Sequence, residues 1–216
     1  MGEVSLNNVP TDSGLTANGY LIIIGGQSNG PDRFTISGNL AAGFQGEQNS
    51  CYTYYKSVNT SADNGSWVQM NAGVNTQQGT PQTGSFSVGV TMANRLRTTY
   101  GKLAYIVPSA VGGTYIANDV TPSWNVTHVG EYYDKMVDWY LKPCLGRLEG
   151  AINNVTPVLV WIHGESDADT VAHGAAYEAN LTALINAFRT DSGYPNMKVI
   201  ITRLRSDYGG TNLGLS

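Results

Sequence analysis

Four short apolar runs, each bounded by turn-forming residues, constrain the fold of this chain more than any other feature. An unbroken apolar run without polar alternation is typical of a strand buried on both faces, as in a parallel sheet. The sequence therefore predicts a largely parallel sheet in the interior of the protein. The runs are Tyr20–Ile24, Leu103–Val107, Val158–Ile162 and Lys198–Leu204, the last centred on Val199-Ile200-Ile201.

Helical patterns lie between the apolar runs. Apolar residues recur at a spacing of three or four in Phe86–Arg97, in Tyr133–Leu141 and in Tyr177–Phe188. Pro143 is expected to interrupt the second helix, because proline has no backbone N–H to donate. The alternation predicts an α/β fold, a flavodoxin-like three-layer α/β/α sandwich with a mainly parallel sheet. In such folds ligands bind at the carboxyl ends of the strands.

The stretch from Pro31 to Gly84 fits this alternation poorly. Cys51–Val58 and Ser66–Met70 are candidate strands, whereas Asn71–Gly84 has the composition of a loop. Two interpretations of this loop stay open. It either shapes a substrate cleft near the strand ends or is a solvated insertion.

Length and charge narrow the class of protein. A chain of 216 residues is expected to form a single domain, here residues 1–216. Twelve Lys and Arg against 16 Asp and Glu give a net charge of −4, with no basic run, so a nucleic-acid partner is not expected. Only 13% of the residues are charged, and such a neutral polar surface suits carbohydrate contact or a packed assembly.

Targeting and redox signals are few. Cys51 and Cys144 lie far apart and form no CxxC pair, so neither a zinc site nor a disulfide framework is predicted. The N-terminus has no basic segment followed by an apolar one, and no run approaches the ~20 apolar residues of a membrane span. The sequence predicts a soluble protein without a membrane partner, and it leaves the localisation open.

The turn Gly25-Gly26-Gln27-Ser28-Asn29-Gly30 directly follows the first apolar run. A hydroxyl on such a turn projects from the sheet edge, where the amides of a following helix can stabilise an oxyanion. Ser28 is therefore a candidate nucleophile, although an ordinary Gly- and Asn-rich turn is the alternative. The turn formally matches G-x-S-x-G, but in α/β-hydrolases that motif follows a strand in the middle of the sheet.

Polar residues also gather after two later strands. Trp161–Asp169 contains His163, Glu165 and two aspartates, and His173 follows shortly. A metal site is one interpretation, but H-E-x-x-H and other zinc spacings are absent. The other interpretation is that His163 and Glu165 reach toward Ser28. The turn Val111–Thr114 follows the Leu103 run and could offer a backbone amide to the same point, a convergence that acyl transfer needs.

These blocks together resemble the SGNH (GDSL-like) hydrolases, in particular the sialate O-acetylesterase-like and acetylxylan esterase-like carbohydrate esterases. Gly26-Gln27-Ser28-Asn29 is similar to their first block. Ile106–Thr114, with Trp124 following, is similar to their second, and Trp161–Asp167 resembles their W-x-Q-G-E-S-D/N block. The resemblance extends along most of the chain, and three blocks in order are specific.

The resemblance implies a role for each matching residue. Ser28 would be the nucleophile, the Gly112 or Gly113 amide would complete the oxyanion hole, and no metal or organic cofactor would be needed. His163 and Glu165 would contribute to the oxyanion hole and to positioning. The residues expected at the substrate cleft are Gln27, Asn29, Thr114 and Trp124.

The chain departs from the family pattern in two ways. His163 stands where the family usually has Gln, and an imidazole can also donate a hydrogen bond, with a different pH dependence. The final D-x-x-H block, which supplies the base His and its Asp, is absent, and no histidine follows His173. Without a base a serine hydroxyl is a poor nucleophile.

Three explanations for the missing base stay open. The sequence is a fragment whose last segment lies elsewhere, or the protein is a degenerate member of the family, or an internal histidine substitutes. Asp169–His173 imitates D-x-x-H with one residue too many, and His173 is expected to be a surface or capping residue. His128, alone in a polar loop, is expected to be solvated.

The sequence thus predicts a serine esterase that removes O-acetyl groups from a carbohydrate. The alternative is a non-catalytic carbohydrate-binding or structural module, for example of a viral tail or another surface assembly. In either case the expected partner is an acetylated carbohydrate, and a homo-oligomer or larger assembly is possible. The sequence leaves the sugar and the position of the acetyl group open.

Overall fold

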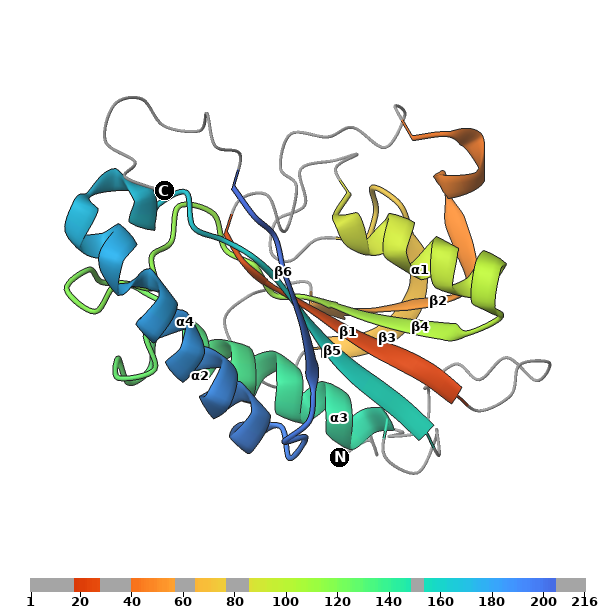
Figure 1. The fold of residues 1–216 in the computed structure, drawn as a ribbon. Coiled ribbons are helices and arrows are strands. Elements are labelled where there is room, and N and C mark those ends of the chain that lie inside the picture. Colours follow the sequence, from red (N-terminus) through yellow and green to blue (C-terminus); the bar gives the residue numbers. More distant parts are fainter. Residues whose placement is uncertain (1–17, 28–39, 57–64, 77–85, 149–153, 205–216) are drawn as a thin grey trace.

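A six-stranded mixed sheet with helices on both faces forms the framework of the protein (Figure 1). The computed structural model describes residues 18–27, 40–56, 65–76, 86–148 and 154–204. The strand order is β3-β2-β4-β1-β5-β6, and neighbouring strands are parallel except β2 and β3. The predicted α/β fold is confirmed. The strands are β1 (Asn18–Gly26), β2 (Glu47–Lys56), β3 (Gly65–Asn71), β4 (Leu103–Pro108), β5 (Asn154–Ile162) and β6 (Lys198–Ile201).

The three central strands carry the predicted motifs. Ile22 in the middle of β1 lies opposite Ile106 of β4 on one side and Val158 of β5 on the other. All six residues of β4 are buried, as expected for a strand covered on both faces. Because the three strands are parallel, their carboxyl ends meet at one edge of the sheet, and each predicted block follows one of these ends.

The segment that fits the alternation poorly supplies two strands to the same sheet. β2 pairs in parallel with β4, with Cys51 opposite Ala104, and β3 pairs with β2 in the antiparallel sense. Both candidate strands of this segment are therefore confirmed. Asn71 ends β3, residues 72–76 form a turn, and the rest of the predicted loop up to Gly84 lies outside the described residues.

The helices divide between the two faces (Figure 1). α1 (Val88–Tyr100) covers one face. It begins after Ser87, whose side-chain oxygen accepts the Gly89 N–H. The other face is covered by α2 (Tyr132–Met136), η4 (Val137–Leu141), α3 (Lys142–Leu148) and α4 (Val171–Asp191). Two short 3-10 turns, η2 (Ala42–Phe44) and η5 (Asp167–Asp169), lie in connections.

The expectation that Pro143 interrupts the second helix is wrong. α2, the π-helical turn η4 and α3 follow one another from residue 132 to 148, and Pro143 lies inside α3. The Lys142 N–H donates to the Val137 carbonyl five residues earlier, which is a π-type bond. Because Pro143 cannot donate to the Trp139 carbonyl, the ordinary α-helical pattern is lost at this point, and the wider turn precedes it.

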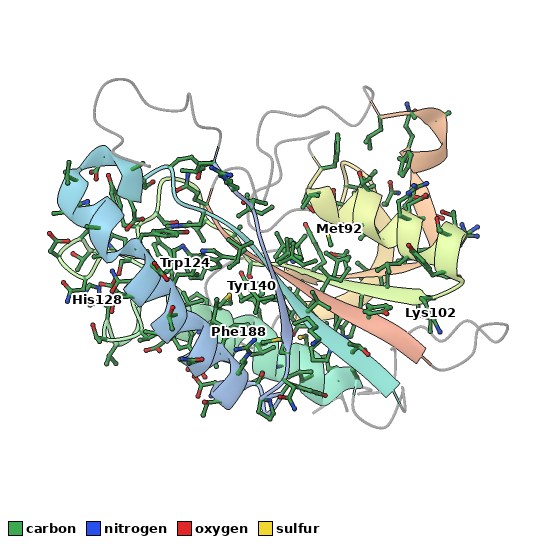
Figure 2. The ribbon with its side chains drawn as sticks, viewed as in Figure 1. Met92, Lys102, Trp124, His128, Tyr140 and Phe188 are labelled. Atoms are coloured by element: carbon green, nitrogen blue, oxygen red, sulfur yellow. The ribbon has the colours of Figure 1, made fainter. Side chains whose placement is uncertain are left out.

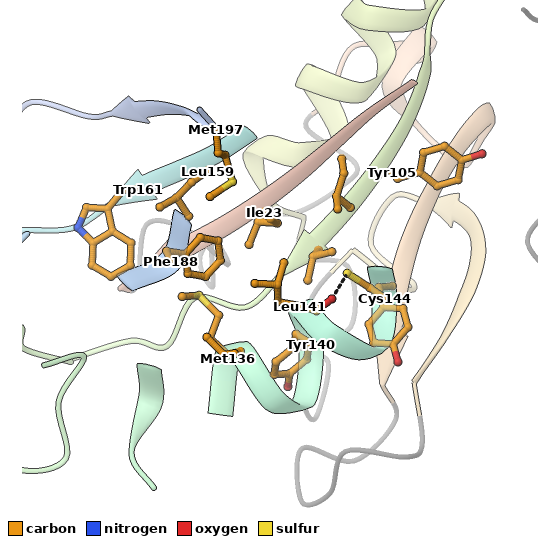
Figure 3. Packing of buried hydrophobic residues seen from close by; sticks show 14 of the residues in the cluster. Ile23, Tyr105, Met136, Tyr140, Leu141, Cys144, Leu159, Trp161, Phe188 and Met197 are labelled. Atoms are coloured by element: carbon orange, nitrogen blue, oxygen red, sulfur yellow. Dashed lines mark hydrogen bonds between the residues drawn. The ribbon is translucent and has the colours of Figure 1, made fainter. Parts of the chain in front are cut away.

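Two hydrophobic clusters fill the spaces between sheet and helices. The cluster under α2 to α4 is rich in aromatic side chains and sulfur, and Figure 3 shows Met136 and Tyr140 within it. Cys144 belongs to it as a free thiol that donates to the Leu141 carbonyl. The cluster under α1 is mostly aliphatic. Among its members are Ile22, Ile24, Cys51, Val90, Ile106, Val158 and Val160.

The edge strand β6 differs from the expected buried strand. Ile200 and Ile201 are 48% and 50% exposed, because β6 has a strand on one side only and little of the described chain covers it. The strand also ends at Ile201, short of the predicted Leu204. In the described part of the chain, the helices are too short or too polar to cross a bilayer.

Candidate active site

The Gly26-Gln27 turn ends β1 in a conformation that only glycine fits. Gly26 has φ +113°, and a Cβ there would lie 2.0 Å from the Ile162 carbonyl oxygen. The next residue, Gln27, is buried, and its N–H donates to the same carbonyl at 2.8 Å. Its side-chain oxygen accepts the Ser166 N–H at 3.2 Å. Gln27 thus binds the first block to the loop after β5, and its predicted role at the substrate cleft stays a prediction.

The predicted nucleophile, Ser28, and its neighbour Asn29 follow directly after Gln27. Both lie outside the described residues. Their predicted roles therefore stay predictions, although the chain that leads to them is fixed by the contacts of Gly26 and Gln27.

The loop after β4 is bound to the end of β1 by its backbone. Ser109 donates both its N–H and its hydroxyl to the Ile24 carbonyl, at 2.8 and 3.0 Å. Two residues on, the Val111 N–H donates to the Gly26 carbonyl at 2.9 Å. Gly112 and the exposed Gly113 follow at once. The predicted oxyanion amides therefore lie in a loop that is attached to the Gly26-Gln27 turn.

Thr114 and Trp124 form a buried pair behind this loop. The indole N–H of Trp124 donates to the Thr114 hydroxyl at 2.7 Å, and that hydroxyl donates to the Val111 carbonyl. Figure 2 places Trp124 on the side of the sheet that α4 covers. Thr114 is 2% exposed and Trp124 is 1% exposed, so this pair packs in the interior and stabilises the loop after β4.

His163, at the end of β5, is almost fully enclosed. It is 2% exposed, and its ring stacks on Trp161 and on Tyr177, with centroids 5.1 and 5.8 Å away. Its Nδ1 lies 3.3 Å from the Tyr177 hydroxyl, which accepts the Trp161 indole N–H at 3.2 Å. Indole can only donate, so the Tyr177 proton is available to Nδ1, and this favours the imidazole tautomer with its proton on Nε2.

Burial also fixes the charge of His163. Desolvation lowers the pKa of the imidazole to about 4, and the Thr114 backbone acts weakly in the opposite direction. The ring is therefore neutral at neutral pH. Its Nε2 has no hydrogen-bond partner within the part of the chain that the structure describes. A neutral N–H donor at the strand end that has no partner among the described residues is suited to an oxyanion role.

Asp167 joins the loops after β4 and β5, a role that the sequence did not single out. Its carboxylate is 1% exposed and accepts the backbone N–H groups of Ile116 and Ala117 at 3.0 and 2.8 Å. Burial raises the pKa of this carboxyl group, and the two amides partly oppose that change. Asp167 is the last residue of the W-x-Q-G-E-S-D block, and this position in a family block could have marked it as a residue of the site. Glu165, which stands between His163 and Asp167 in the sequence, is half-buried.

The predicted solvated role of His128 is wrong. Its side chain is 16% exposed, and both ring nitrogens are engaged in the loop before α2. Nδ1 faces the Ser123 hydroxyl at 2.9 Å and Glu131 at 3.2 Å, and Nε2 lies 2.8 Å from the Asn118 carbonyl. His128 therefore stabilises this loop (Figure 2).

His173 lies in the first turn of α4, and it bridges two loops. Its Nδ1 is 2.6 Å from Asp169 and its Nε2 3.1 Å from Asp119, which belongs to the loop after β4. The Tyr115 hydroxyl also donates to Asp169. These carboxylates raise the pKa of His173, the Asp169 hydrogen bond most of all. Neither ring nitrogen is available to accept a proton from a serine.

The site as a whole consists of three backbone-linked loops at one sheet edge. The described residues contain no group of three or more His, Cys, Asp or Glu placed to hold a metal ion. The three central strands are parallel. β1 leads into Gly-Gln-Ser-Asn, and the second and third blocks lie at the neighbouring strand ends, which defines an α/β protein of the SGNH-hydrolase type.

Comparison with known proteins gives the family. The family model for SASA, carbohydrate esterase, sialic acid-specific acetylesterase, matches residues 18–213. The chain therefore belongs to this family of carbohydrate esterases. Among curated proteins, none matches the sequence.

Solved structures share the fold at low sequence identity. A protein from Arabidopsis thaliana has a TM-score of 0.63 and 21% identity over 89% of this chain and 76% of its own. NanS has a TM-score of 0.60 and 15% identity, covering 89% and 69%. A carbohydrate acetylesterase from Xanthomonas citri has a TM-score of 0.54 and 17% identity, covering 85% of this chain but 41% of its own.

Proposed function

We propose that this protein hydrolyses O-acetyl esters of a carbohydrate with Ser28 as the nucleophile. The observation that carries the proposal is the attachment of three loops at one sheet edge. Val111 binds Gly26, Gln27 binds both Ile162 and Ser166, and the next residue along the chain is Ser28. The family is one of carbohydrate esterases, and a structural neighbour is described as a carbohydrate acetylesterase.

The proposed reaction has two steps. The Ser28 oxygen attacks the acetyl carbonyl and loses its proton, and the sugar oxygen leaves with a proton, so that an acetyl-enzyme remains. Water then attacks the acetyl carbonyl and releases acetate and the free serine. The negative charge on the carbonyl oxygen would be stabilised by the amides of Ser28 and of Gly112 or Gly113, and by the Nε2 proton of His163. The scheme uses no metal or organic cofactor.

The proton acceptor for Ser28 is not identified among the three histidines of the sequence. His128 and His173 are held by partners at both ring nitrogens. His163 has a pKa of about 4, which makes it a weak base and a better neutral donor. The test of the nucleophile therefore supplies a base from solution.

The experiment measures acetate release from an O-acetylated methyl glycoside, with and without added imidazole. We expect imidazole to accelerate release by the wild-type chain. Ser28→Ala should lower the imidazole-dependent rate at least ~100-fold, because the nucleophile is lost. Ser192→Ala is a matched control, since it removes a serine hydroxyl at the C-terminal end of α4, outside the three loops of the site. Equal rates for Ser28→Ala and wild type would refute the assignment of Ser28 as the nucleophile. No acetate release by the wild type in the presence of imidazole would favour a non-catalytic module.

A further inference from the structure

A cavity of about 320 Å³ lies next to the candidate active site, on the face covered by α2 and η4. Two of its lining residues, Ser109 and Val111, are those that bind β1 through the Ile24 and Gly26 carbonyls. The cavity therefore shares a wall with the loop that carries Gly112. Its volume lies in the range of small-molecule sites. The other lining residues are Ala110, Trp124, Tyr132, Lys135, Met136, Trp139 and Tyr140.

The aromatic wall of the cavity comes from an unusual piece of helix. Trp139 and Tyr140 belong to the π-helical turn η4 (Val137–Leu141), which joins α2 to α3 without a break in the helix. Turns of this kind are rare and occur often at functional sites. Figure 3 shows Tyr140 on this turn, with Met136 one turn before it. The local distortion thus coincides with the wall of the cavity.

Lys135 gives the cavity a positive charge. Its Nζ lies 5.7 Å from the centroid of the Tyr132 ring and 5.6 Å from that of Trp139, so two aromatic faces hold the ammonium group. No carboxylate of the described residues lies within ion-pair distance of it, because the acidic residues nearby in the helix have other partners. Glu131 accepts the Ser123 N–H and contacts His128, Asp134 accepts the Gly130 N–H, and Asp138 pairs with Lys142.

The combination of these groups defines the ligand. Aromatic faces carry partial negative charge and pack against the weakly positive C–H groups of a pyranose ring. An ammonium group without a protein carboxylate can bind an anionic substituent by a charge-assisted hydrogen bond. A purely apolar ligand, such as an acyl chain, would leave the Lys135 charge buried against it at a cost.

We propose that this cavity is a binding subsite for a pyranose ring that bears an anionic substituent, with Lys135 as its counter-charge. As the neighbour of the catalytic loop it would hold a sugar unit of the acetylated carbohydrate, and in this respect the proposal rests on the proposed function. A carboxylate and a sulfate offer the same charge to Lys135, and the probes below separate them.

Calorimetric titration of the chain at low salt tests the subsite without catalysis. The probes are glucuronate, glucose 6-sulfate and glucose. We expect glucuronate to bind at least ~10-fold more tightly than glucose, and Lys135→Met to remove most of this preference. Lys142→Met is the matched control, because Lys142 lies on the same helix, is exposed and is paired with Asp138. Circular dichroism verifies that each variant is folded.

The outcomes separate the two proposals. Binding of both anions supports recognition of charge, whereas binding of glucuronate alone supports a carboxylate geometry. Equal affinity for glucuronate and glucose, or equal effects of Lys135→Met and Lys142→Met, would overturn the subsite. Preferential anion binding by the wild-type chain, together with no esterase activity of that chain even in imidazole, would support the subsite and refute the proposed function. Esterase activity without a preference for anions would support the proposed function and refute the subsite.

Discussion

Two histidines ten residues apart in the sequence have opposite chemistry. His163, on the inner side of the site, is enclosed by aromatic rings, and burial lowers its pKa to about 4. His173, on the outer side, lies between Asp169 and Asp119, and these carboxylates raise its pKa. One ring is therefore neutral at neutral pH, whereas the other favours its charged form.

The difference separates a region suited to catalysis from a region that holds the loops in place. The inner region, with the Gly26 turn and His163, is desolvated, so a hydrogen bond made there is strong and a charge is costly. The outer region, with His173 and its two aspartates, is accessible to water, which weakens each ion pair. Changes in the inner region should therefore have large effects, and changes in the outer region small ones.

The largest expected effect is that of Gly26→Ala. The new Cβ would overlap the Ile162 carbonyl, and φ +113° strains any residue with a side chain. We expect the free energy of unfolding to fall by at least about 4 kcal/mol, measured by urea denaturation. Gly113→Ala is the control for a glycine with open space, since no atom lies within 4 Å of its Cβ position, and φ +71° should cost about 1 kcal/mol. Equal losses for the two variants would contradict the comparison.

Substitution of His163 comes next. If its Nε2 proton stabilises the oxyanion, His163→Ala should lower kcat by about 10²–10³ in the imidazole-supplemented assay. His163→Gln, which restores the residue usual in the family, keeps an N–H donor but cannot accept a proton. We expect His163→Gln to retain most of the activity. A loss as large as that of His163→Ala would instead assign His163 as a proton acceptor.

The stability of the same variants depends on pH in a defined direction. With the pKa of His163 lowered from 6.5 to about 4, the unfolded chain binds more protons between these values, so stability falls as the pH falls. Relative to His163→Gln, the wild type should lose about 2–3 kcal/mol between pH 7 and pH 4.5. Urea denaturation at both pH values measures the difference, and parallel curves would show that the imidazole is not desolvated.

The smallest expected effect is that of His173→Gln. A raised pKa means that the stabilisation is present below the usual value of 6.5 and is lost as the pH rises through the folded-state pKa. We expect a loss of less than about 1 kcal/mol at pH 6 and a smaller one at pH 9, because exposed ion pairs contribute little. A larger loss at the higher pH would reverse the sign and contradict the charged bridge.

The sequence predicted the centre of the sheet well and its margins less well. Strands β1, β4 and β5 are buried on both faces, so an unbroken apolar run marks them directly. β6 has a similar run but lies at an edge, where burial depends on neighbours that a local pattern does not reveal. The helix across Pro143 was missed because a π turn accommodates the proline, an adjustment for which the spacing of apolar residues gives no signal.

The candidate site was predictable in position but not in its internal contacts. Strand ends and the family blocks brought Gly26, the Val111–Thr114 turn and His163 to one edge. The binding of Asp167 to the Ile116 and Ala117 amides is a long-range contact, so nothing near Asp167 in the sequence predicts it. The cavity beside Lys135 was likewise missed, because its wall combines the loop after β4 with the helix around η4.

The backbone bonds between the first two blocks have a consequence for how this site can change. Val111 and Ser109 bind β1 through their backbone N–H groups, which any residue except proline can supply, and the Ser109 hydroxyl adds a second bond to the Ile24 carbonyl. Side chains in the loop after β4 can therefore vary while Gly112 keeps its place. The number of residues between Ile106 and Gly112, in contrast, cannot change. One insertion would move the amides out of register with the Ile24 and Gly26 carbonyls. The position of Gly112 thus depends more on the length of this loop than on most of its side chains.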